Sequence, residues 1–221
     1  MMIYADREQK KTIKEQIAES VFEDVVCGVY PPGTVLNEGT LAEKYGVSKA
    51  PVREALVTLC NDGALINIPR FGYQVASITP RQFLDMQDLR VIIEEEALRR
   101  TVGSILPQQL EELEENVHAG ECLVNEKDIL KHWRHNMSFH LLLCKQCQNE
   151  YFYRSLVGIL RFFSRAAMQY YTRSWEQGKR TDTASHEQIL QAIRDKDVEA
   201  AVSLLRRDIG CMEQEFLANK Q

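Results

Sequence analysis

Three polar residues stand at positions where the helical period of their surroundings calls for apolar side chains. His186 begins a face that continues with isoleucine and leucine, Asp208 interrupts the apolar face of the last predicted helix, and His140 lies one turn from Cys144. Burying an unpaired His or Asp is costly, so each group needs a partner. Three such groups on three helices of one bundle can satisfy one another around a divalent cation. The alternative is that the two histidines are hydrogen-bonded within the core.

A second group of residues suits contact with DNA, at the first turn of a predicted helix. When a helix enters the major groove, the side chains at its N-terminal end reach the base edges. The residues at that end are Ser48, Lys49, Ala50, Pro51 and Arg53. Lys49 and Arg53 share a face, where arginine can bind guanine O6 and N7 with two donors and lysine supplies a point charge. The alternative is an ordinary solvated helix face.

The elements that position these DNA candidates occupy residues 1–78. Apolar residues recur every fourth position in the first predicted helix, and Gly46-Val47 joins the second and third helices by a very short connection. Alternating apolar residues on either side of residues 69–72 predict a β-hairpin. Three helices followed by a hairpin are typical of a winged helix-turn-helix. At the hairpin tip, Arg70 suits a minor groove or a phosphate, and Gly72 permits close backbone approach.

The metal candidates belong to a different kind of domain. Strand signals fade after residue 78, and long helical periods follow over residues 126–147, 150–172, 184–194 and 197–217. Residues 79–221 therefore read as an all-α domain, an antiparallel helical bundle. The predicted fold is mainly α, with an N-terminal winged helix-turn-helix followed by that bundle.

Composition narrows the class of protein. The 221 residues include 27 Lys and Arg against 32 Asp and Glu, for a net charge of −5, and 44% are hydrophobic. These values exclude a disordered tail, a collagen-like fibre and a disulfide scaffold. No apolar run is long enough to cross a membrane and the charged N-terminus lacks a signal-peptide core, so we expect a cytoplasmic protein with free thiols. The mild acidity means that DNA binding must depend on local charge.

The sequence around the predicted helix-turn-helix resembles the core signature of the GntR family of bacterial transcription regulators. The resemblance runs through Gly33-Thr34-Val35-Leu36-Asn37-Glu38, from Leu41 to Leu56, and on to the hairpin tip. The helical remainder resembles the FadR-type branch, which carries an FCD ligand-binding domain. Its marks are Arg90 with Glu94, Phe139-His140, Asn149, His186-Glu187 with Ile189, and Asp197 with Ala200. The family commonly has arginines in place of Gly39 and Lys49, which implies modest affinity for each DNA half-site.

That resemblance implies a metal site in the helical domain. Many members hold a divalent ion with an Asp, a His four residues later and two further His. The corresponding residues here are Asn136, His140, His186 and Asp208, a donor set that would accept Zn, Ni or Mn. In the family this metal is no catalyst but anchors a small carboxylate effector, for which the candidate countercharges are Arg90, Arg161 and Arg165. Arg90 is equally well placed to pair with Glu94, one turn on.

These features together predict a ligand-responsive repressor of transcription, without enzymatic activity. We expect a homodimer, because one helix-turn-helix with few basic contacts is a poor reader of DNA and two copies can read a pseudopalindromic double-stranded operator. A small organic acid is the expected effector. Two alternatives are a metal-dependent helical enzyme joined to a DNA-binding module, and a pure metal sensor. The enzyme would need a nucleophile or general base beside the metal, and the sequence offers none beyond the ligands themselves.

Overall fold

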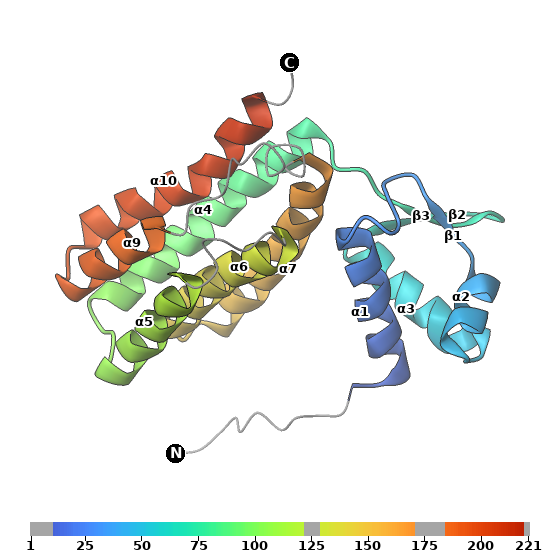
Figure 1. Cartoon of the computed structure of the whole chain (residues 1–221), viewed down its shortest axis with the longest axis horizontal. Coiled ribbons are helices and arrows are strands. Elements are labelled where there is room, and N and C mark those ends of the chain that lie inside the picture. The colour runs from blue at the N-terminus through green and yellow to red at the C-terminus, as the bar shows by residue number, and fades with distance from the viewer. Residues whose placement is uncertain (1–10, 122–128, 171–183, 219–221) are drawn as a thin grey trace. The chain divides into compact units, whose positions relative to one another are not determined.

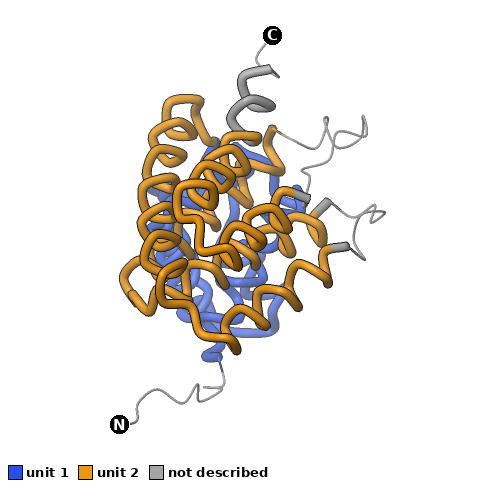
Figure 2. Tube along the Cα trace, turned by 90° about the vertical axis from the view of Figure 1, so that its left-hand side faces the viewer, with its two compact units in different colours: residues 1–77 blue, residues 78–221 orange. Residues whose placement is uncertain are grey.

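The computed structural model describes residues 11–121, 129–170 and 184–218, and the chain divides into two compact units. One unit comprises residues 1–77 and the other residues 78–221 (Figure 2). Within the described ranges, helices dominate both units and strands occur only in the first (Figure 1). The prediction of a mainly α fold is confirmed.

The first unit combines three helices with a small antiparallel sheet. Its elements are α1 (Ile13–Val26), β1 (Val35–Leu36), α2 (Glu38–Tyr45), α3 (Lys49–Asn61), β2 (Leu65–Ile68) and β3 (Gly72–Val75). The strand order is β1-β3-β2, with Ile68 opposite Gly72 across the hairpin and Leu36 opposite Tyr73. This is the predicted winged helix-turn-helix, with β1 as an addition that the sequence pattern did not reveal.

Local signals explain where these helices begin and end. Thr12 forms a capping box at the start of α1, and Asn37 caps α2 by accepting a hydrogen bond from the Gly39 N–H at 2.8 Å. Gly46 ends α2 in the left-handed conformation (φ 65°), which is open to glycine without steric cost. Ser48 occupies the N-cap position of α3, and its hydroxyl makes no capping hydrogen bond.

The core of the first unit forms where α1 and α3 pack against each other and α3 packs against β2. Val21 of α1 and Leu56 and Leu59 of α3 are completely buried there. Gly72 allows β3 to approach β1 closely, because a Cβ at this position would lie 2.5 Å from the Leu36 carbonyl oxygen. Packing and sheet pairing together therefore fix the direction of α3 and of the hairpin within the unit.

The second unit is a helical bundle. Its described helices are α4 (Pro80–Val102), α5 (Pro107–Glu121), α6 (Ile129–Gln146), α7 (Glu150–Tyr170), α9 (Ala184–Arg194) and α10 (Val198–Ala218). α4 packs against α6, α7 and α10, and α9 packs against α10 and α5 (Figure 1). Thr79 and Gln82 form a capping box at the start of α4, where Pro80 needs no backbone N–H. None of the described helices is long and apolar enough to span a membrane.

Two apolar clusters fill the bundle, and α4 contributes to both. One contains the edge-to-face pair of Phe83 and Phe163, whose ring centroids are 5.3 Å apart. The other contains Leu98, Phe139 and Ile189. The helical periods predicted from the sequence correspond to α6, α7, α9 and α10, with residues 126–128 and 171–172 outside the described ranges. α4 therefore links the two halves of the core.

Candidate metal centre and DNA-binding surface

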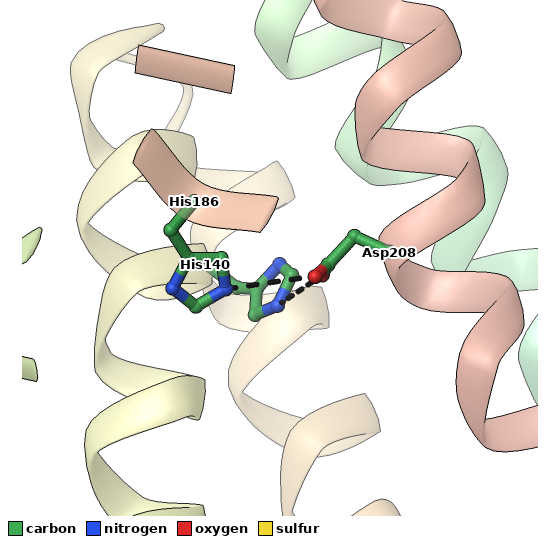
Figure 3. Close-up of side chains that lie close together, drawn as sticks. All are labelled: His140, His186 and Asp208. Atoms are coloured by element: carbon green, nitrogen blue, oxygen red, sulfur yellow. Dashed lines mark ion pairs between the residues drawn. The ribbon is translucent and has the colours of Figure 1, made fainter. Parts of the chain in front are cut away.

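Three of the predicted metal ligands converge inside the helical bundle. His140 comes from α6, His186 from α9 and Asp208 from α10, and their side chains point toward one another (Figure 3). The Oδ2 atom of Asp208 lies 3.2 Å from Nε2 of His140 and 3.8 Å from Nε2 of His186. The three side chains are only 1%, 1% and 9% exposed. One potential ligand atom from each residue falls within 4.8 Å of the others.

The geometry of this cluster fits a divalent ion. The Nε2 atoms of both histidines are buried and make no hydrogen bond of acceptable geometry, although each faces the Asp208 carboxylate. Two ligands that each lie about 2.1 Å from a tetrahedral zinc are about 3.4 Å apart, close to the two separations observed here. An ion among the three residues would satisfy both nitrogens.

Glu94 contacts His140 from the side opposite to Asp208 and also binds Arg90. Its Oε2 lies 2.6 Å from Nδ1 of His140, and its Oε1 accepts a hydrogen bond from Nε of Arg90 at 2.6 Å. A carboxylate that holds Nδ1–H of a histidine leaves Nε2 free to bind a metal and fixes the direction of the ring. On the other side, the ring of Phe139 stacks on His186 at 3.9 Å between centroids, and Ser185 hydrogen-bonds to Asp208.

The buried charges set the protonation of these ligands. Burial lowers the pKa of His186 to about 3, so its imidazole is neutral at pH 7 and ready to bind a metal. Burial opposes ionisation of Glu94 and Asp208, but the adjacent cations outweigh it and hold the pKa of each carboxyl below its usual value. For His140, the negative charge of Glu94 outweighs burial and raises the pKa. Binding a metal at Nε2 of His140 therefore displaces a proton.

The other predicted pocket residues lie on α4, α6 and α7. Asn136 is buried on α6, one turn before His140. Arg90 is 1% exposed, and its guanidinium lies 5.4 Å from the centroid of the Phe163 ring. It forms the ion pair with Glu94 that the sequence analysis gave as the alternative to effector binding. Arg161 and Arg165 lie one turn apart on α7; Arg165 is buried, with its guanidinium 5.8 Å from the Phe162 ring.

The predicted DNA contacts lie on the surface of the first unit. Ser48, Lys49, Ala50 and Arg53 are exposed at the start of α3, and Pro51 is half-buried. Arg53 forms a two-point ion pair with Glu38 of α2, a contact that no sequence pattern predicts. Arg70 and Phe71 are exposed at the tip between β2 and β3.

Comparison with known families decides between the classes of protein. The family model described as "FCD domain" matches residues 85–210, and "Bacterial regulatory proteins, gntR family" matches residues 13–75. The chain belongs to the GntR family. It is a DNA-binding transcription regulator with an FCD domain, and members of this family are regulators and not enzymes.

Several GntR-family relatives extend over most of this regulator. The uncharacterized HTH-type transcriptional regulator YdhC of Bacillus subtilis is 29% identical over 79% of this chain and 77% of its own length. The gluconate operon transcriptional repressor of B. subtilis is 24% identical over 78% of this chain and 72% of its own. The solved structure of E. coli McbR/YncC covers 96% of this chain and 100% of its own, with a TM-score of 0.82 at 21% identity, and shares its fold.

Arg70 generates a prediction about the hairpin tip. Its φ of 71° is unusual for a residue with a side chain, and glycine would adopt it without strain. Replacing Arg70 with Gly should leave the free energy of unfolding unchanged or raise it by up to about 1 kcal/mol. Affinity for specific and unrelated duplexes should fall by a similar factor, with a salt dependence reduced by about one phosphate contact.

Urea unfolding and fluorescence anisotropy at two salt concentrations measure these effects of the Arg70→Gly change. Arg81→Ala is the control, because Arg81 is also a highly exposed arginine but lies in the second unit. Unchanged DNA affinity in the Arg70→Gly protein would show that the hairpin tip does not contact the duplex.

The metal cluster generates a second prediction. A metal bound to His140, His186 and Asp208 joins three helices and should stabilise the folded protein by about 2.7 kcal/mol at 100 times its dissociation constant. After chelator treatment, zinc should raise the melting temperature of the wild-type protein. It should do the same for the His118→Ala control, in which the histidine removed is exposed and lies outside the cluster. His186→Ala should lose this increase. Equal shifts in all three proteins would assign His186 to the core as a hydrogen-bonded residue.

Proposed function

We propose that this GntR-family regulator is a repressor that binds a pseudopalindromic operator as a homodimer and releases it when a small carboxylate metabolite binds in the FCD domain through a divalent metal. The observation that carries this proposal is the convergence of His140, His186 and Asp208, with two buried nitrogens that lack a hydrogen bond. A core histidine normally has a partner for each buried nitrogen. Two such nitrogens facing one carboxylate favour a bound ion.

The donor set also explains how a carboxylate would be recognised. Three protein ligands leave at least one coordination position open for an exogenous group. A divalent ion there supplies a Lewis acid that holds a carboxylate oxygen. Arg161 and Arg165 on α7 are the candidate countercharges for the remainder of such a ligand.

The names of two relatives support repression. One is named as a transcriptional repressor, RspR of E. coli, which is 30% identical over 62% of this chain and 60% of its own length. Another is named as the repressor of a gluconate operon, and gluconate is a carboxylate. The charge balance supports dimerisation, because residues 1–78 carry more acidic than basic residues and one copy would offer few contacts to DNA.

Hydrogen bonds within the second unit join the end of α7 to Ile78, just before α4, and they support a route by which the effector could act. The side-chain amide of Gln169, at the end of α7, accepts from the Ile78 N–H and donates to the Ile78 carbonyl, each at 3.0 Å. Tyr170 also donates a hydrogen bond to that carbonyl. Because α7 carries Arg161 and Arg165, a shift of this helix on ligand binding would reach Ile78 directly. Coupling requires that the ligand favour one position of α7 over another.

The proposal predicts that metal and organic acid act together on DNA binding. The experiment is a fluorescence anisotropy titration of a duplex selected by the wild-type protein from a random pool. Chelator-treated protein is compared with and without zinc, each with and without small carboxylic acids such as gluconate and lactate. One of these acids should weaken binding at least fivefold only when zinc is present, and His186→Ala should not respond.

Each other outcome of this titration contradicts a definite part of the proposal. An effect of zinc alone, equal with and without the acids, would identify a metal sensor. Consumption of an acid during the titration, followed by chromatography, would identify an enzyme. Sedimentation velocity in the same buffers tests the assembly, and a monomer at micromolar concentration both with and without DNA would rule out the homodimer.

A further inference from the structure

We propose that Glu38 and Tyr73 are positioning residues that hold Arg53 in the orientation needed to read a guanine in the major groove. The inference rests on the DNA-binding role of α3 and is independent of the effector. Arg53 donates from Nε to Oε1 of Glu38 and from Nη2 to Oε2, both at 2.8 Å. The Tyr73 hydroxyl donates to Oε1 of the same carboxylate at 3.2 Å. These contacts join α3, α2 and β3.

The carboxylate is the anchored end of this arrangement and the guanidinium is the exposed end. Glu38 is the first residue of α2, directly after the Asn37 cap, and its side chain is 20% exposed. Tyr73 is buried in the core of the unit. Arg53 has a side chain that is 62% exposed. Because the core fixes Tyr73 and the cap fixes the start of α2, Glu38 restrains Arg53.

The hydrogen bonds with Glu38 leave one edge of the guanidinium for DNA. A guanidinium has five N–H donors in a fixed plane, and Glu38 takes those of Nε and one of Nη2. The edge formed by Nη1 and the second hydrogen of Nη2 still matches two acceptors side by side, such as O6 and N7 of guanine. A long side chain that is already restrained loses less conformational entropy when it binds.

The negative charge of Glu38 also directs Arg53 toward bases. Paired with a carboxylate, Arg53 is a weaker anchor for phosphate, since phosphate contacts depend on net positive charge. Lys49 lies beside Gly39, with its ammonium 3.9 Å from where a Cβ of residue 39 would be, and supplies a point charge of the kind that suits phosphate. The arrangement assigns phosphate contact to Lys49 and base reading to Arg53.

The test replaces single guanines in a duplex that the wild-type protein selects from a random pool. Each guanine is changed in turn to 7-deazaguanine, which lacks the N7 acceptor. For the wild-type protein, one position in each half-site should lose about tenfold in affinity, as expected for one base contact. Glu38→Gln should reduce that penalty to about twofold, and Tyr73→Phe should give an intermediate value. Affinity for an unrelated duplex should be unchanged or higher in Glu38→Gln, because a negative charge has been removed.

Two matched variants separate positioning from charge and from folding. Glu43→Gln makes the same change of charge at an exposed position of α2 and should keep the full penalty. Arg53→Ala should abolish it, and adding Glu38→Gln to Arg53→Ala should change nothing further. Thermal melts monitored by circular dichroism verify that every variant compared is folded.

Three results would overturn the inference. The first is a full 7-deazaguanine penalty in the Glu38→Gln protein. The second is a rise in affinity by the same factor for selected and unrelated duplexes, which would make Glu38 a competitor of DNA for Arg53. The third is a wild-type protein insensitive to every 7-deazaguanine, which would remove Arg53 from base reading and leave the effector proposal intact.

Discussion

The carboxylate of Glu94 lies almost completely buried in the helical bundle, between Arg90 on its own helix and His140 on α6. Taking a carboxylate out of water costs several kcal/mol, and this cost is recovered only when its oxygens are fully occupied. Here each oxygen has a partner at 2.6 Å. Removing either partner would leave an uncompensated charge in the core, at a cost of about 3–5 kcal/mol. The packing of α4 against α6 therefore depends on this carboxylate.

Glu94 also orients the proposed metal ligands. Because Glu94 holds Nδ1 of His140, the Nε2 atom is turned toward Asp208 on α10 and His186 on α9. The stacked ring of Phe139 and the hydroxyl of Ser185 restrain His186 and Asp208 in turn. Four helices thus meet at one buried polar cluster, so a ligand bound there would touch elements that are distant in the sequence.

The features of this protein that depend on residues close together in the sequence could be predicted from it. The short connection at Gly46-Val47 indicates the helix-turn-helix, because Gly46 can adopt the left-handed conformation that ends α2. The glycine and proline at residues 69–72 indicate the turn of the hairpin. His140 and His186 were visible because each breaks an apolar face. The pairing of Glu94 with His140 was not visible, since the two residues are 46 positions apart and no helical period connects them.

The same limit explains what was missed in the first unit. Glu38 and Arg53 are 15 residues apart and belong to different helices, so no periodicity connects them. β1 has only two residues and is defined by its pairing with β3. Two residues are too few to show an alternating pattern, so the sequence alone could not reveal this strand. The exposed left-handed backbone of Arg70 was likewise hidden, because the type of turn is determined jointly by Pro69 and by the hairpin register.

Anomalous diffraction at the zinc absorption edge tests the central claim most directly, using crystals of chelator-treated protein to which zinc has been restored. The account predicts one strong anomalous peak within about 2.0–2.2 Å of Nε2 of His140, Nε2 of His186 and an oxygen of Asp208. Glu94 should still contact Nδ1 of His140. Zinc bound elsewhere, with these three side chains contacting only one another, would contradict it.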